Sequence, residues 1–228
     1  MGRAVALSDS AWARYCRAET ERMLRCYSSG ISGMYGVQLG GWVLPDEVHD
    51  SLALTTLFRC SLEQTCDDDL RGTFSRLPIE SESLAAVLAP FALDGLTEPE
   101  TVLEEIDRVL MPEGHVVLMA TLPLTPWMGV VPGPLPGIAR VMRYLGGRGY
   151  DITLRRRYLY RPPLGDQRWL ERLAFMDRLG LGLAGAGLMV ARKRVIGVTP
   201  AGVTLRMKTA SARERAGVPA GLAGGGAR

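Results

Sequence analysis

The chain of 228 residues has few of the residues that hold metals or form disulfide frameworks. It contains four cysteines and two histidines, and no two cysteines form a CxxC pair. Structural zinc and iron–sulfur sites need closely spaced Cys and His ligands, so no metal site is expected. Without a disulfide framework, reduced thiols in a cytoplasmic protein are the simplest interpretation.

Long apolar runs are also missing. Residues 1–10 lack the apolar run of a secretory signal peptide. The most apolar late stretch, 179–191, is rich in glycine and too short to cross the roughly 30 Å of bilayer hydrocarbon. The sequence therefore predicts no transmembrane segment.

A strong charge of one sign is lacking as well. The net charge is +3, but residues 206–228 alone hold five Lys/Arg against one Glu. Residues 1–205 are therefore close to neutral, which excludes the basic footprint of a nucleic-acid-binding domain. We expect one folded domain over 1–205 and a disordered, basic, Ala/Gly-rich tail over 206–228.

Residues 77–120 carry the clearest structural pattern. The segments 85–90 and 116–121 are apolar at every position before the terminal Thr121, as expected for strands buried on both faces inside a parallel sheet. Apolar residues between them recur at helical spacing: Leu103, Ile106 and Leu110. Strand, helix and strand form a βαβ unit, which predicts an α/β sheet.

The start and the outer face of this helix are also predicted. Thr97 followed three residues later by Glu100 indicates a capping box. Glu104 and Arg108, four residues apart, are expected to pair on the outer face.

Similar patterns predict the remaining elements. Helices are expected over 10–27, 138–145 and 169–179, and strands over 35–39, 52–60, 150–160 and 188–198. Segment 52–60 fits a helix as well. The strand at 150–160 is expected to place four side chains on one face: Ile152, Leu154, Tyr158 and Tyr160. His49 and Asp50 are interpreted as part of a solvated loop.

The 77–120 segment resembles the second half of class I S-adenosylmethionine-dependent methyltransferases of the methyltransferase type 11-like group. Members of that group read "LPF", then an apolar strand, then "P-x-x-x-L-x-E-x-x-R-V-L" and a Pro-x-Gly turn. The matching residues are Leu77-Pro78-Ile79, Ser83, Val87, Pro99, Leu103, Glu105, Arg108-Val109-Leu110, Pro112 and Gly114. The resemblance implies a doubly wound, mostly parallel, seven-stranded Rossmann-like sheet with helices on both faces. Its last strand would insert antiparallel beside its neighbour.

The resemblance also implies S-adenosylmethionine as cofactor, bound where the strand order reverses, between the family's first and fourth strands. The family's acidic residue and glycine loop correspond to Gln38–Leu44, where Gly40 keeps the first glycine and Trp42 and Leu44 replace the later two. The expected cofactor contacts are Gln38, Gly40 and Gly41 for the methionine end, Glu63 for the ribose, and Thr73 to Leu77 for the adenine. The sequence assigns no catalytic residue.

Pro90, Phe91 and Asp94 are expected to face the methyl acceptor, although Asp94 fits an ordinary turn equally well. In the resembled family the helix at 10–27 covers the cofactor cleft, but simple packing on the sheet edge explains its apolar stripe too. The basic residues at 155–157 and 192–194 fit either a protected sheet edge or phosphate binding.

The loop Leu122–Gly137 contains five prolines and three glycines and is apolar. It is a candidate substrate lid or protein-partner surface. Two alternatives to an active enzyme stay open. One is a catalytically inactive methyltransferase-like binding or scaffold module with a degenerate cofactor loop. The other is a peripheral membrane protein that inserts Trp127 and Met128 into lipid.

Overall fold

The computed structural model describes residues 10–27, 30–40, 44–61, 69–70, 72–131, 133–163, 166–180 and 182–194. All of them lie in one compact unit, Met1–Ile196. The expected tail at 206–228 lies outside the described residues, so its predicted boundary stays a prediction.

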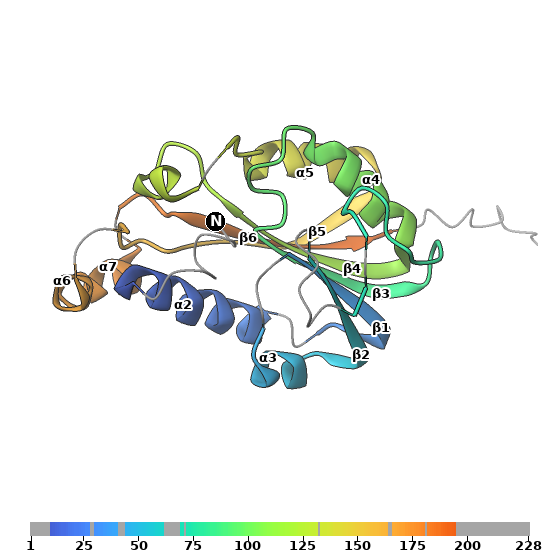
Figure 1. Cartoon of the computed structure of the whole chain (residues 1–228), viewed down its shortest axis with the longest axis horizontal. Helices are drawn as coiled ribbons and strands as arrows, with labels where there is room; N and C mark the ends of the chain where they lie inside the picture. Colours follow the sequence, from blue (N-terminus) through green and yellow to red (C-terminus); the bar gives the residue numbers. More distant parts are fainter. Residues whose placement is uncertain are drawn as a thin grey trace, which may run out of the picture. The chain divides into compact units, whose positions relative to one another are not determined.

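A six-stranded sheet forms the centre of this unit, with strand order β2-β1-β3-β4-β6-β5 (Figure 1). The strands are β1 (Ser32–Leu39), β2 (Ala53–Cys60), β3 (Leu84–Pro90), β4 (Leu110–Thr121), β5 (Tyr150–Tyr158) and β6 (Ala186–Lys193). The first four strands pair in parallel, and β6 lies antiparallel between β4 and β5. The Rossmann-like α/β prediction and the antiparallel last strand are confirmed. Seven strands were expected, whereas the described residues form six.

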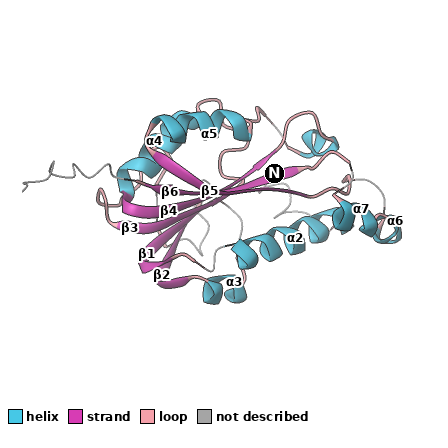
Figure 2. Ribbon diagram, turned by 180° about the vertical axis from the view of Figure 1, so that it is seen from behind, coloured by secondary structure: helices cyan, strands magenta, loops and turns pink. Residues whose placement is uncertain are grey.

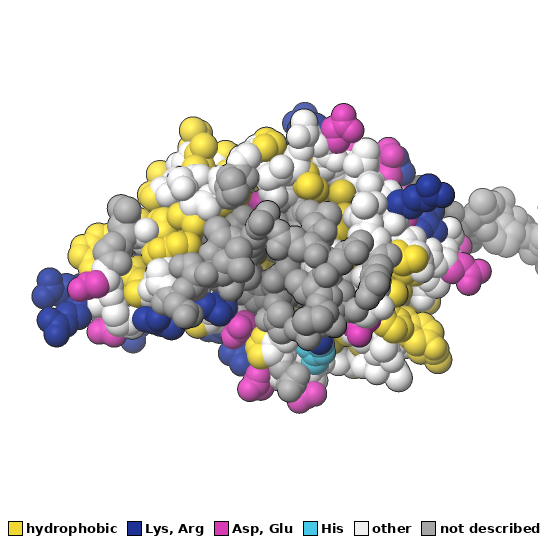
Figure 3. Space-filling model, viewed as in Figure 1, with side chains coloured by type: hydrophobic (Ala, Val, Ile, Leu, Met, Phe, Trp, Pro, Cys, Tyr) yellow, Lys and Arg dark blue, Asp and Glu magenta, His cyan; other side chains and the backbone are white. Residues whose placement is uncertain are grey.

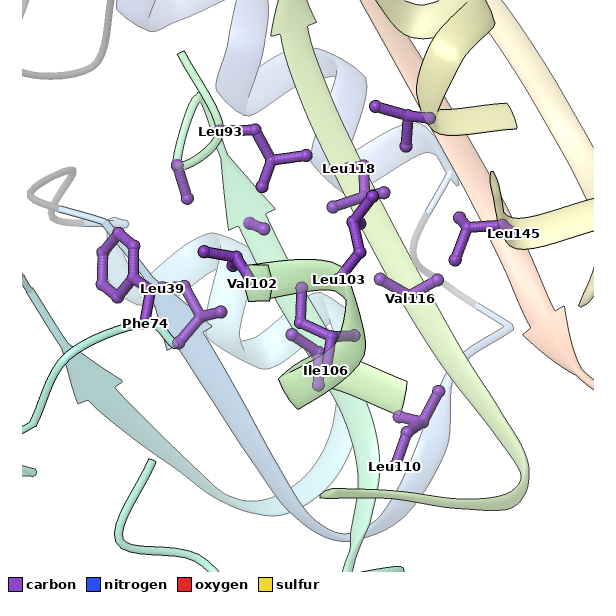
Figure 4. Close-up of a cluster of buried hydrophobic side chains, with 14 of the residues drawn as sticks. Leu39, Phe74, Leu93, Val102, Leu103, Ile106, Leu110, Val116, Leu118 and Leu145 are labelled. Carbon is purple, nitrogen blue, oxygen red and sulfur yellow. The ribbon is translucent and has the colours of Figure 1, made fainter. Parts of the chain in front are cut away.

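Helices cover both faces of the sheet, as Figure 2 shows from behind. Helices α4 (Pro99–Val109) and α5 (Ile138–Gly147) pack on one face, which we call the α4 face. Helices α2 (Ala11–Tyr27) and α3 (Asp46–Ser51) pack on the other, the α2 face. The core of the α4 face includes side chains of α4 seated against β3 and β4 (Figure 4).

The βαβ unit has the predicted order, but two local predictions were wrong. Helix α4 has Glu98, not Thr97, at its N-cap, and no side chain caps it; the Thr101 hydroxyl instead donates to the Glu98 carbonyl. Arg108 pairs with the buried Glu105 (2.7 Å) rather than with Glu104. Glu104 instead meets Arg148 (3.2 Å), which follows helix α5.

The Glu105–Arg108 pair fastens the segment before β3 to helix α4. A carboxylate oxygen of Glu105 accepts the backbone N–H of Leu77 (2.7 Å), and the Arg108 guanidinium donates to the carbonyls of Leu77 (3.3 Å) and Ile79 (2.9 Å). The Arg108 hydrogen bonds lower the pKa of Glu105. This clamp gives a physical reason for the acidic and Arg-Val-Leu positions of the motif.

Other elements differ from prediction in detail. Segment 53–60 is strand, so its helical alternative was wrong. His49 and Asp50, expected in a solvated loop, lie in the short helix α3 (Asp46–Ser51). The single helix expected over 169–179 is two short ones, α6 (Gln167–Arg172) and α7 (Ala174–Leu179).

Strand β5 contains a bulge that the alternating pattern did not predict. Ile152 pairs with Ala191 and Leu154 with Val190, so Thr153 is an extra residue. Ile152 packs in the α4-face core, whereas Leu154 and Tyr158 pack in the α2-face core. The prediction that all of them share one face was therefore wrong.

The Leu122–Gly137 loop is anchored rather than free. It contains the 3-10 helix η1 (Pro126–Val130), whose Trp127 is 0% exposed. The Trp127 indole donates to the Arg161 carbonyl (2.9 Å) and packs edge-on against Trp12 of α2, with ring centroids 6.1 Å apart. A Cβ at Gly185 would lie 2.0 Å from the Trp127 ring, so only glycine leaves room there. The membrane alternative is wrong for Trp127, because this side chain is buried in protein.

Candidate functional site

The strand order reverses between β1 and β3, and the chain carries an unusual backbone there. Gly40 follows β1 with a φ of 114°, and its N–H donates to the Cys60 carbonyl at the end of β2 (3.0 Å). A Cβ on Gly40 would come within 3.3 Å of the Pro90 carbonyl at the end of β3. Three parallel strands therefore end close together around a residue that must be glycine.

Buried polar side chains gather at this carboxyl edge. Among the described residues, the buried polar or charged side chains are Thr20, Gln38, Ser61, Glu105 and Thr121. Gln38 and Thr121 stand at the ends of β1 and β4, and Ser61 directly follows β2. Only Glu105 belongs to the clamp on α4. Buried polar groups are costly unless they are hydrogen-bonded, so their concentration at one edge indicates a functional site.

Asp94 extends this polar edge. Its carboxylate accepts hydrogen bonds from the Thr121 hydroxyl (2.6 Å) and the Thr121 backbone N–H (3.2 Å). Burial raises the pKa of Asp94, although the hydrogen bonds from Thr121 act in the opposite direction. Asp94 thus carries a carboxyl group that retains a proton more readily than an exposed aspartate.

The turn that carries Asp94 has a constrained backbone. It starts at Pro90, the last residue of β3, and Phe91 adopts a φ of 55°. The Phe91 N–H donates to the Met119 carbonyl (2.9 Å), and its side chain is buried in the α2-face core. A bulky residue with positive φ stores backbone strain, which is typical of positions that orient functional groups.

Helix α2 and strand β5 add residues that sequence reasoning missed. Thr20 of α2 and Tyr158 of β5 are buried, with 3.5 Å between their hydroxyls. Cys16 is also buried. Burial raises the pKa of both Cys16 and Tyr158, and the negative charge of Asp94 adds to the rise. The sequence signal that could have revealed Cys16 and Thr20 was the helical spacing of the residues that α2 buries: Ala13, Cys16, Thr20, Met23 and Leu24. Cys and Thr were not counted as members of that stripe.

The remaining predicted contacts lie as follows. Thr73 is exposed in a turn whose Phe74 side chain lies beside Leu39, at the carboxyl end of β1 (Figure 4). Leu77 is buried in the α4-face core, and its N–H is held by Glu105. Gly41, Glu63 and Trp42 lie outside the described residues.

The described part of the chain lacks two further features. No group of three or more His, Cys, Asp or Glu side chains there could hold a metal ion. No helix in the same residues is long and apolar enough to cross a membrane.

The geometry favours a reaction that depends on how the reacting groups are aligned. The edge offers a glycine backbone, a buried amide and a carboxyl group with a raised pKa, drawn from β1, the turn after β3 and the elements that cover them. Such groups can hold a polar ligand away from water and exchange a proton with it.

Known proteins resemble the part of the chain that forms this edge. A family model described as a methyltransferase domain matches residues 55–118, from β2 to β4. A search of curated protein sequences finds no match.

Several solved structures share the fold. A Haloferax volcanii protein solved in complex with the Trm112 methyltransferase activator is 18% identical, with a TM-score of 0.56 over 77% of this chain and 89% of its own. An S-adenosylmethionine-dependent methyltransferase from Mesorhizobium loti is also 18% identical, with a TM-score of 0.53 over 75% and 96%. The [4+2]-cyclase SpnF is 16% identical, with a TM-score of 0.58 over 82% and 84%. The resemblance to class I methyltransferases is thereby confirmed, and identities this low show the fold.

Proposed function

We propose that this chain, which has the class I methyltransferase fold, binds S-adenosylmethionine and methylates an acceptor held at the carboxyl edge of its sheet. The observation that carries the proposal is the position of Gly40 where the strand order reverses, against the Pro90 carbonyl and Ala92 of the turn that leads to Asp94. The family match over β2 to β4 supports it independently.

The residues at this edge fit the cofactor. Gly40 leaves its backbone open to close approach, since a Cβ would press on the Pro90 carbonyl. The buried Gln38 amide offers a donor and an acceptor to a zwitterionic methionine end. In the same proposal, Gly41 extends the glycine backbone, Glu63 binds the ribose, and the turn at 73–77 lies beside the adenine. S-adenosylmethionine, when bound, supplies a methyl group activated by a positively charged sulfur.

The residues after β3 would serve the acceptor. Pro90 and the strained Phe91 fix the turn, and Asp94 faces the edge with a carboxyl group whose pKa is raised. A deprotonated Asp94 can accept a hydrogen bond from the acceptor's nucleophilic group and take up its proton as that group becomes alkylated. Helix α2, with Cys16 and Thr20 on its buried side, excludes water from this edge.

Calorimetric titration with S-adenosylmethionine and S-adenosylhomocysteine tests the proposal. We expect saturable binding that Gly40→Ala weakens by about tenfold or more, because the new Cβ meets Pro90 and the φ of 114° is strained for alanine. The matched control is Gly146→Ala in α5, where nothing lies within 4 Å of the added atom. No heat and no thermal shift with millimolar ligand would overturn the proposal.

A non-catalytic binding module is the second candidate, and one observation favours it. Leu44, at the end of the glycine loop, is buried in the α2-face core, and Gln38 replaces the family's acidic residue. The double variant Gln38→Asp/Trp42→Gly restores the family pattern at two positions. A gain in cofactor affinity would show that the loop alone weakens binding, whereas no binding by either protein would favour the module, with the Leu122–Gly137 loop as the partner surface. The Trm112 complex of the Haloferax volcanii neighbour makes a protein partner a reasonable candidate.

A further inference from the structure

A second hollow lies at the carboxyl edge, on the α4 face and away from Gly40. It has a volume of about 360 Å³, within the usual range for small-molecule sites. Its walls come from the start of the Leu122–Gly137 loop, the first turn of α5, the end of β5 and the segment before β6: Leu122, Pro123, Thr125, Gly137, Ile138, Ala139, Arg155, Arg157, Tyr160, Gly180, Gly182, Leu183 and Ala184. We call it the β5–α5 cavity.

The bulge in β5 determines which arginines line this cavity. After the extra residue Thr153, Arg155 and Arg157 share the α4 face, whereas Arg156 lies over the Tyr27 ring of α2 at 5.8 Å. Arg157 pairs in register with Gly187, and a Cβ on Gly187 would meet Ile138 at 2.6 Å. The missing side chain at Gly187 therefore brings the start of α5 close to the sheet beside Arg157.

These two arginines differ from the other arginines of the late strands. Arg192 pairs with Glu113 (2.6 Å) and Arg194 with Asp151 (2.8 Å). Neither Arg155 nor Arg157 has an ion-pair partner among the described residues, and the cavity lining contains no Asp or Glu. Two positive charges two positions apart on one face of a strand repel each other, so a bound anion would stabilise both.

The rest of the cavity is apolar. Leu122, Pro123, Ile138 and Ala184 form much of the wall, and Leu183 is exposed over 65% of its surface at the margin. Hydrophobic side chains gather over this end of the molecule, with Lys and Arg side chains beside them (Figure 3). Apolar walls with a paired cationic group suit a ligand that has an apolar body and one anionic group.

We propose that the β5–α5 cavity binds an amphipathic anion, with its carboxylate or phosphate on Arg155 and Arg157 and its apolar body against Leu122 and Ile138. The site does not depend on methyl transfer, and its test measures binding directly. Decanoate and decyl phosphate serve as probes, and decyltrimethylammonium and inorganic phosphate serve as comparison compounds.

We expect both anionic probes to bind below their micellar concentrations and the Arg155→Gln/Arg157→Gln variant to bind them about tenfold or more weakly. Arg156→Gln, on the same strand but the opposite face, and Arg168→Gln/Arg172→Gln, which removes the same charge from α6, should change the dissociation constant less than about twofold. Ala139→Trp in the first turn of α5 should block the cavity while keeping both arginines. Equal binding of the cationic probe, or unchanged affinity in both the double variant and Ala139→Trp, would overturn the proposal.

A sedimentation experiment with lipid vesicles identifies the source of the anion. If the protein sediments with phosphatidylglycerol vesicles and the Arg155→Gln/Arg157→Gln variant does not, the anion is a lipid headgroup. Binding of dispersed decanoate without sedimentation would indicate a free ligand. Phosphatidylcholine vesicles of the same size are the uncharged control.

Discussion

The two faces of the sheet bury polar groups in different ways. On the α4 face, Glu105 and Arg108 come from adjacent turns of one helix and bond to the backbone of the segment they hold. On the α2 face and the carboxyl edge, Thr20, Asp94 and Tyr158 come from elements far apart in the chain. The first arrangement fixes a loop, and the second assembles a polar edge under a covering helix. We expect polar groups of the first kind to maintain the fold and those of the second kind to serve the proposed site.

The largest expected effect concerns how α2 and the Leu122–Gly137 loop are joined. Trp127→Ala removes a fully buried indole and its hydrogen bond to Arg161, so we expect a loss of about 3–5 kcal/mol in the free energy of unfolding. Met128→Ala is the neighbouring control, because Met128 is 45% exposed and should cost no more than about 0.5 kcal/mol. Denaturant unfolding of both variants makes the comparison, and equal losses would show that Trp127 is no anchor.

A smaller loss is expected from the clamp on the α4 face. Glu105→Gln removes the charge that Arg108 faces and weakens the acceptor for the Leu77 N–H, which should cost about 1–3 kcal/mol. Glu104→Gln breaks only the exposed pair with Arg148 and should cost less than about 1 kcal/mol. Chemical denaturation at neutral pH measures both, and a Glu104 effect as large as the Glu105 effect would contradict the clamp.

The smallest effect is a difference in pH dependence between the two faces. The pKa of Glu105 is lowered in the folded state, so its stabilisation is present at neutral pH and is lost as the pH falls through the folded pKa. The pKa of Asp94 is raised, so the folded protein binds the proton more tightly than the unfolded chain. Its contribution is present at low pH and is lost as the pH rises through the folded pKa.

Asp94→Asn should therefore remove a component of stability that falls with rising pH, and Glu105→Gln a component that rises with it. Unfolding free energies between about pH 2 and 8 would show opposite changes in slope, below about pH 4.5 for Glu105→Gln and above about pH 4 for Asp94→Asn. Asp151→Asn, which alters an exposed pair with Arg194, is the surface control. Slopes that change in the same direction would mean that the two carboxylates have similar surroundings.

The fold was predictable where the pattern is local. Segments 85–90 and 116–120 are apolar at every position, and the apolar residues of the helix between them recur every three to four residues, so strand, helix and strand follow from neighbouring residues. The cap at Glu98 and the Glu105–Arg108 pair could not be read in this way. The pair depends on where Leu77 and Ile79 lie in space, and sequence separation does not show this.

The site was predictable only in part. Gln38, Gly40 and Asp94 were found through the resemblance, and their contact roles stay predictions. Thr20 escaped notice because a threonine in a helical stripe looks like a surface residue, and Tyr158 was placed on one face of its strand but given no part in the site. Tertiary packing buries them, and it involves α2, which lies more than 100 residues from β5 in the chain.

The extra residue in β5 has a consequence for comparing this chain with its structural neighbours. Where a neighbour lacks the bulge, an alignment without a gap at Thr153 would match inward positions with outward positions along the second half of the strand. Deleting Thr153 would exchange the two rows, turning Arg155 and Arg157 toward α2 and Tyr158 toward the α4 face. A single inserted residue thus decides which side chains of the second half of β5 reach each side of the sheet.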